Sequence, residues 1–162
     1  MIPVDGAFIL AVSPRFSGAR DDAQRRIVGD ISAAFAPTLA HYRIDSRLRI
    51  AHFMAQVTHE CAGFRTTEEF ASGAAYEGRR DLGNTERGDG RRYKGRGLIQ
   101  LTGRANYRQM SERLSLPLEA EPELAAEPLT SLKIACEYWH TRQINEAADR
   151  DDLIRATRLV NG

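Results

Sequence analysis

The stretch Arg47–Phe70, RLRIAHFMAQVTHECAGFRTTEEF, carries the strongest helical pattern of the chain and decides its fold class. Apolar residues recur through Leu48–Val57 until the predicted helix is apolar nearly all round, which is typical of a central, buried helix. Asp45-Ser46 offers capping side chains at the start of this helix, and Gly63 suits a cap at its end. The stretch therefore predicts a buried helix that ends near Cys61.

Helical spacing of apolar residues continues on both sides of this stretch. Residues 1–19 are rich in turn-forming proline and glycine, and a helical pattern then begins at Arg20 and is interrupted by Pro37. Nearer the C-terminus, the spacing predicts further helices over Ala105–Leu114, Leu129–Tyr138 and Asp151–Leu159.

Residues 64–103 differ from the rest, because glycine recurs through them and no helix-length apolar pattern is present. This part predicts loops with one or two short strands, and Leu98–Leu101 is the best strand candidate. The whole sequence, residues 1–162, therefore predicts a single, mainly α-helical domain with a glycine-rich insertion of loops and short strands.

Composition and charge limit the classes of function. A chain of 162 residues with 42% hydrophobic and 28% charged residues is typical of one soluble globular domain. Its net charge of +1 argues against the strong field of a dedicated nucleic-acid-binding protein. No run approaches the ~20 apolar residues of a membrane-spanning helix, and the N-terminus does not read as a secretory signal. We therefore expect a monomer that is made and kept in the cytoplasm unless another component releases it.

Metal and thiol chemistry find little support in the sequence. His59-Glu60 begins the His-Glu-x-x-His motif of zinc proteases, but Gly63 occupies the place of the second histidine. Cys61 and Cys136 form neither a metal-binding pair nor a disulfide framework. Both cysteines are therefore predicted to be small buried residues, and no metal site is predicted.

Three glutamates stand at the end of the predicted central helix and just after it. A carboxyl group at the end of an apolar helix, such as that of Glu60, is partly removed from water and holds a proton more readily. Glu68 and Glu69 follow a short loop that can turn back across a cleft. Two carboxyl groups in different environments across a cleft are what glycoside hydrolysis requires. The alternative is that all three are solvated surface charges.

A second stretch, Tyr93–Tyr107, reads YKGRGLIQLTGRANY. Its glycines allow the backbone to approach a ligand closely, and Gln100, Thr102, Asn106 and Tyr107 offer hydrogen bonds of the kind that bind sugars. The alternative is a basic surface loop in which these side chains satisfy the local backbone. A phosphate-binding loop does not fit, because no Gly-Lys-Ser/Thr follows the glycines.

The arginines of Arg87–Arg108, with Tyr93 and Tyr107 for stacking, also leave a nucleic-acid-binding hypothesis open. The near-neutral charge of the whole chain speaks against that hypothesis.

Taken together, HECAGFRTTEEF and the later GDGRRYKGRGLIQLTGRANY resemble the pattern of glycoside hydrolase family 19, which includes chitinases and phage endolysins. The resemblance is strong over Arg47–Arg108, and Val160-Asn161-Gly162 resembles a late element of the same family. It implies a lysozyme-like, mainly α-helical fold with a substrate cleft. It also implies inverting hydrolysis of β-1,4 bonds at N-acetylated amino sugars, with no cofactor and no metal. Family members usually continue beyond the Asn-Gly element, so a C-terminally short domain is expected.

The resemblance also implies roles for individual residues. Glu60 corresponds to the general acid and Glu69 to the base that activates water, with Glu68 as the weaker candidate for the base. Thr102 corresponds to the residue that helps to hold the attacking water. The two carboxyl groups of an inverting pair are expected ~6.5–9.5 Å apart, which leaves room for that water. The positions that correspond to the substrate cleft are His59, Glu68, Arg96, Gln100, Asn106, Tyr107 and Asn161.

Chitin and peptidoglycan both contain N-acetylglucosamine, so these residues do not separate the two substrates. The small size, the lack of a signal and the lack of an appended chitin-binding module favour a phage or prophage endolysin that a holin releases to the cell wall. The basic stretch Arg87–Arg108 would suit an anionic wall surface. The alternatives are a chitinase, an effector injected into rival bacteria, and a non-catalytic wall-binding relic.

Overall fold

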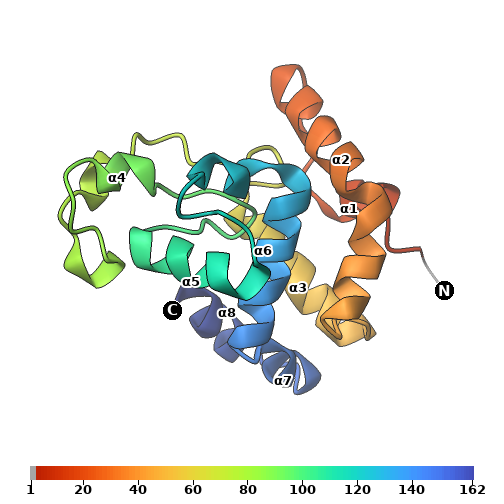
Figure 1. The fold of residues 1–162 in the computed structure, drawn as a ribbon. Coiled ribbons are helices and arrows are strands. Elements are labelled where there is room, and N and C mark those ends of the chain that lie inside the picture. The colour runs from red at the N-terminus through yellow and green to blue at the C-terminus, as the bar shows by residue number, and fades with distance from the viewer. Residues whose placement is uncertain (1–2) are drawn as a thin grey trace.

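The computed structural model describes residues 3–162, and this part of the chain is mainly helical (Figure 1). The mainly α-helical class predicted from the sequence is confirmed. The α-helices are α1 (Gly6–Val12), α2 (Ala19–His41), α3 (Arg47–Glu60), α4 (Asp89–Arg92), α5 (Arg104–Leu114), α6 (Pro128–Thr141), α7 (Ile144–Asp149) and α8 (Leu153–Asn161). Short 3₁₀-helices lie at η1 (Ala74–Tyr76), η2 (Arg80–Leu82) and η3 (Pro122–Ala126).

Helix α3 is buried as predicted. The Ser46 side chain caps its N-terminus by accepting a hydrogen bond from the backbone N–H of Arg49. Phe53 and Val57 are fully buried, and the Phe53 ring meets Trp139 of α6 edge to face at 5.3 Å. Helix α6 runs between the N-terminal helices and the glycine-rich part (Figure 1), so one helix supports both sides of the molecule.

The end of α3 reverses the chain. Gly63 donates its N–H to the carbonyl of Thr58 at 2.8 Å, and Ala62, Gly63 and Phe64 all have positive φ angles. The left-handed capping residue is therefore Ala62, and the predicted cap Gly63 is the residue after it. Gln24 of α2 donates a hydrogen bond to the Gly63 carbonyl and fixes this turn against the rest of the protein.

The glycine-rich part is held by a small apolar cluster and by buried polar groups. Asp89 is almost fully buried and accepts two hydrogen bonds from Arg104, at 2.6 and 2.9 Å. Buried Asn84 bonds the backbone of Tyr76 and of Arg104. The apolar cluster consists of Tyr93, Leu101, Tyr107, Met110, Leu118, Ala125 and Ile134.

Two helical predictions need correction. The turn-rich N-terminal part contains α1, which Asp5 caps by accepting a hydrogen bond from the N–H of Phe8. Helix α2 continues through Pro37 to His41, and the next turn places buried Leu39 in the core. Packing of an apolar residue in the core outweighs the local preference of the proline.

The strand predicted over Leu98–Leu101 is wrong. Residues 98–100 form a turn, while Arg96 and Leu101 exchange backbone hydrogen bonds at 3.1 and 2.8 Å across it. Gly97 and Gln100 adopt positive φ angles that a strand does not allow. The result is a tight turn that aims the Gln100 side chain at the site described next.

Within residues 3–162, no helix has the length and apolar character needed to cross a membrane. The same part of the chain contains no group of three or more His, Cys, Asp or Glu residues that could hold a metal ion.

Candidate active site

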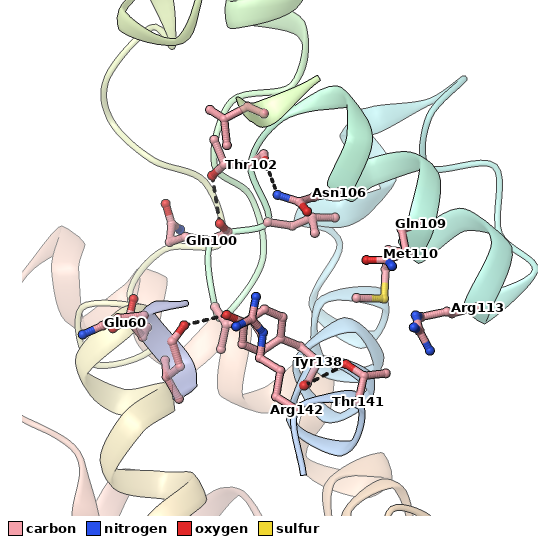
Figure 2. Close-up of a pocket in the computed structure, with 15 residues that line it drawn as sticks. Glu60, Gln100, Thr102, Asn106, Gln109, Met110, Arg113, Tyr138, Thr141 and Arg142 are labelled. Carbon is pink, nitrogen blue, oxygen red and sulfur yellow. Dashed lines mark hydrogen bonds between the residues drawn. The ribbon is translucent and has the colours of Figure 1, made fainter. Parts of the chain in front are cut away.

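A pocket of about 330 Å³ lies between the end of α3, the turn before Leu101, and helices α5, α6 and α8 (Figure 2). Its volume is within the range of small-molecule sites. Figure 2 shows Gln100, Thr102 and Asn106 on one side of the pocket and Tyr138, Thr141 and Arg142 on the other. The sequence-predicted residues that line it are Glu60, Gln100, Thr102, Asn106 and Asn161.

Glu60 is the last residue of α3 and is half-buried at the pocket wall. Its carboxyl group forms no hydrogen bond or ion pair with the residues that the structure describes, so it is free to meet a ligand. Burial raises the pKa of the neighbouring Tyr138 hydroxyl, Arg142 lowers it, and the charge of Glu60 raises it. The Glu60 carboxylate therefore acts electrostatically on the facing helix α6.

The neighbouring glutamates Glu68 and Glu69 have different surroundings. Glu68 forms an ion pair with Lys94 at 2.6 Å, and Arg96 lies 3.8 Å away. Glu69 accepts a hydrogen bond from the Tyr76 hydroxyl at 3.0 Å through Oε2, while its buried Oε1 has no hydrogen-bond partner in the described part of the chain. Glu68 is therefore neutralised by its neighbours, and Glu69 keeps one oxygen for another role.

Glu69 meets Gln100 and Thr102 around Gly95. A Cβ atom at Gly95 would lie 2.7 Å from Gln100 Oε1, 3.1 Å from Glu69 Oε2 and 3.2 Å from Thr102 Oγ1. The φ angle of Gly95 is not in the left-handed region, so space alone explains the glycine. Its missing side chain lets three oxygen-bearing side chains from two chain segments converge on one point.

Backbone contacts orient these side chains. Thr102 donates its hydroxyl proton to the Gln100 carbonyl at 2.9 Å, which leaves the lone pairs of Oγ1 as acceptors. Asn106, in the first turn of α5, donates to the Thr102 carbonyl at 2.7 Å. The pocket wall is therefore built from local hydrogen bonds, as the alternative interpretation of this loop required, and it still presents oxygen atoms to the pocket.

Four of the predicted cleft residues, Glu68 among them, and the predicted base Glu69 lie outside the pocket lining. Tyr107 is fully buried and donates its hydroxyl to the Lys94 carbonyl at 2.8 Å. Arg96 is also buried and donates to the Tyr107 hydroxyl at 3.2 Å. Both side chains point into the protein and hold the segment that carries Lys94, the partner of Glu68. His59 is exposed on the last turn of α3 and is not among the residues that line the pocket.

Comparison with known families assigns the chain. The family model for glycoside hydrolase family 19, described as chitinase class I, matches residues 27–156. The chain belongs to glycoside hydrolase family 19.

Curated relatives agree with this assignment. A glycosyl hydrolase family 19 domain-containing protein of Haemophilus influenzae is 35% identical over 94 residues, which cover 58% of this chain and 45% of the relative. The acidic endochitinase Q of Nicotiana tabacum is 34% identical over 110 residues, which cover 67% of this chain and 41% of the relative. The chain thus spans less than half the length of these curated relatives.

Solved family 19 structures share the fold. The class IV chitinase from Zea mays superimposes with a TM-score of 0.61 at 22% identity, over 94% of this chain and 76% of that chain. Chitinase C from Streptomyces griseus gives a TM-score of 0.54 at 19% identity, over 91% of this chain and 79% of that chain. The predicted lysozyme-like family 19 fold is therefore confirmed.

In this family 19 chain, part of the pocket wall was not identified from the sequence. Tyr138 and Arg142 of the α6 end line the pocket, and the Arg142 guanidinium lies 4.3 Å from the centre of the Tyr138 ring. Tyr138 donates its hydroxyl to the Val160 carbonyl at 2.6 Å, which joins α6 to α8. The apolar spacing of this segment predicts a core helix, and only its polar end, Thr141-Arg142, signals a surface role.

The basic stretch Arg87–Arg108 is less cationic than its sequence suggests. Arg104 pairs with Asp89, and Arg108 pairs with Glu119 at 2.8 Å. Together with the inward-facing Arg96, these pairs remove much of the positive surface expected for binding nucleic acid or an anionic wall. Three of the six arginines of this stretch are thus paired or buried, and the anionic-surface role of the stretch stays a prediction.

The two cysteines are buried and free, as predicted. Burial raises the pKa of the Cys61 thiol to about 12, and burial likewise raises the pKa of Cys136. A thiol with a raised pKa stays protonated near neutral pH, so Cys61 is not an activated nucleophile despite its place beside Glu60.

Proposed function

We propose that this chain is a glycosidase that hydrolyses β-1,4 bonds between N-acetylated amino sugars, with Glu60 as general acid and Glu69 as base. The observation that carries the proposal is the contrast between these carboxyl groups. Glu60 lines a ligand-sized pocket without a protein partner, whereas Glu69 keeps its buried Oε1 unpaired and places its Oε2 near Gln100 and Thr102 around Gly95. Two carboxyl groups in different environments are the requirement for this reaction.

In the proposed reaction, Glu60 donates its proton to the glycosidic oxygen as the bond to the anomeric carbon breaks. A water molecule attacks that carbon from the opposite face, and Glu69 Oε1 accepts its proton. Tyr76 holds the other oxygen of Glu69, and the free lone pairs of Thr102 Oγ1 orient the water. One displacement by water inverts the anomeric configuration.

The test is the replacement of Glu60 by glutamine, which keeps the shape of the side chain but removes the proton. We expect the rate to fall at least ~100-fold while the thermal midpoint stays within a few degrees. Glu146→Gln, at an exposed position of α7, is the matched control. NMR of the first product should show the inverted anomer. Wild-type turnover by folded Glu60→Gln protein, or a retained anomer, would contradict the mechanism.

Within this reaction class we propose that the substrate is peptidoglycan and that the chain acts as a phage or prophage endolysin. The supporting observation is positive charge in the pocket. Arg142 has no carboxylate within ion-pair distance in the described residues, and Arg113 has only Glu137 at 3.9 Å. Cations beside the glycan path suit the acidic peptides that peptidoglycan carries and neutral chitin lacks. Such an endolysin would remain in the cytoplasm until a holin-type pore releases it.

The second candidate is a chitinase, which the names of the tobacco and maize proteins favour. Turbidity clearing of permeabilised Gram-negative cells, run beside cleavage of a soluble chitin oligomer, separates the two. Clearing that depends on Glu60, without chitin cleavage, supports the endolysin. Chitin cleavage without clearing supports the chitinase, and binding without either activity supports a non-catalytic relic.

A further inference from the structure

A stack of two phenylalanines around one arginine lies beside the loop that joins the two candidate catalytic glutamates. The Arg65 guanidinium lies 5.7 Å from the centre of the Phe16 ring and 5.5 Å from the centre of the Phe70 ring. Phe70 is 79% exposed, the largest value among the exposed large apolar side chains of the described residues. The exposed Phe70 ring and the cation beside it together offer a ligand both an apolar contact and a positive charge.

The stack continues into an open hollow with more positive charge. Arg15, Phe16, Ser17, Ala19 and Arg20 line this hollow. Among the residues that the structure describes, no carboxylate forms an ion pair with the arginines of the hollow or with the stacked arginine. Asp21, which follows Arg20 on α2, pairs with Arg25 instead. The surface is therefore positively charged and partly apolar.

This surface is fixed to the turn that follows α3 by side-chain and backbone contacts. Gln24 donates one hydrogen bond to the Pro14 carbonyl at 2.9 Å and another to the Gly63 carbonyl at 2.8 Å. A Cβ atom at Gly63 would lie 3.1 Å from Phe16, so the two loops are in close contact. The loop that follows α3 carries Arg65, and Phe70 directly follows Glu69 in the chain. The patch thus includes the residue that directly follows the proposed base in the chain.

We propose that Phe16, Arg65 and Phe70, with Arg15 and Arg20, form a subsite for the peptide stems of a peptidoglycan strand whose sugars occupy the pocket. The inference rests on the proposed function and specifies its substrate. The arginines bind peptide carboxylates, and the exposed Phe70 ring covers the apolar parts of the peptide. Contact with two rings restricts the Arg65 guanidinium before binding, which lowers the entropy lost on complex formation.

The test measures binding to purified Gram-negative sacculi by sedimentation, in Glu60→Gln protein so that the polymer is not cut. Phe70→Ala and Arg65→Gln are the test variants. Ile154→Ala, at another strongly exposed apolar residue, and Arg150→Gln, at another exposed arginine, are the matched controls. We expect each test variant to bind sacculi about 3–10-fold more weakly and the controls to bind normally.

Chemical conversion of the peptide carboxylates to amides supplies the second comparison. Amidated sacculi should bind the parent protein at least as weakly as intact sacculi bind Arg65→Gln, because Arg15 and Arg20 lose their partners as well. Arg65→Gln should lose less on amidation than the parent does, and Phe70→Ala, which removes only an apolar contact, should lose as much as the parent does. Equal binding of intact and amidated sacculi would overturn the subsite. The subsite would also be contradicted if the control variants lost as much binding as the test variants. It would equally be contradicted if the parent protein bound phosphatidylglycerol vesicles more tightly than sacculi and this binding depended on Phe70 and Arg65.

The binding assay separates this inference from the proposed function. If lysis depends on Glu60 but binding is unchanged in Phe70→Ala and Arg65→Gln, the subsite is contradicted and the proposed glycosidase function is supported. If binding depends on both residues but the unmodified chain hydrolyses nothing, the subsite is supported and the proposed glycosidase function is contradicted. Because Phe70 is mostly exposed, we expect Phe70→Ala to fold normally, and thermal unfolding checks this directly.

Discussion

Replacing Gly95 by alanine tests whether the convergence of Glu69, Gln100 and Thr102 produces catalysis. The added Cβ atom would lie 2.7 Å from Gln100 Oε1 and 3.1 and 3.2 Å from oxygens of Glu69 and Thr102. The Gln100 oxygen must therefore move by about half an ångström or more, and the other two must move by a few tenths, to reach ordinary van der Waals separation. Alanine suits the backbone conformation, because the φ angle of Gly95 is not positive.

The expected magnitude follows from these shifts. A displacement of about 1 Å in a reacting group can lower a rate ~100-fold, so we expect kcat to fall about 10- to 100-fold. The free energy of unfolding should change by no more than about 1 kcal/mol, because the flexible end of Gln100 can yield and alanine restricts the unfolded chain. The assay is the initial rate on the preferred glycan, measured beside thermal unfolding.

Gly29→Ala is the matched control for this substitution. Gly29 is exposed within α2, and a Cβ atom there would meet no atom within 4 Å. We expect Gly29→Ala to stabilise the fold by about 0.5–1 kcal/mol without changing kcat. Wild-type kcat in Gly95→Ala, or a loss of activity that merely follows unfolding, would refute the role assigned to this cluster.

Three further predictions concern charged and ionisable groups. Glu69→Gln should lower kcat at least ~100-fold, whereas Glu68→Gln should lower it less than ~10-fold, because Glu68 is already neutralised by its ion pair; equal losses in steady-state assays would contradict the assignment of the base. Arg104 holds the pKa of Asp89 below its usual value, so this pair stabilises the fold above about pH 4 and the stabilisation is lost as the pH falls further. Asp89→Asn should then cost about 2–4 kcal/mol at pH 7 by urea unfolding and should flatten the acid side of the stability profile. The Cys61 thiol should resist alkylation by iodoacetamide at pH 8 in the native protein and react after unfolding, because burial raises its pKa to about 12; rapid native labelling would reopen a thiol mechanism.

Patterns between near neighbours in the sequence predicted the helical part of the fold. The apolar spacing of α3 and the cap at Ser46 depend on residues three or four positions apart, so the helix could be located before its partners were known. Short helices were harder to predict from the sequence. Helices α1 and α7 have only one or two turns, and their stability comes from packing. The turn at Leu98–Leu101 was mistaken for a strand, because a short apolar run does not specify its backbone.

The sequence by itself determined the family, the mainly α-helical class and the order of the candidate carboxyl groups. Each of these depends on short runs of neighbouring residues, such as His59-Glu60. Only the tertiary structure decided which side chains meet. Glu69 keeps a free oxygen while Glu68 is paired, and Tyr107 is buried although its motif suggested a surface role. These outcomes depend on contacts such as that of Gly95 with Gln100 and on partners far away in the chain. Packing selects those partners, and no local pattern of residues encodes them.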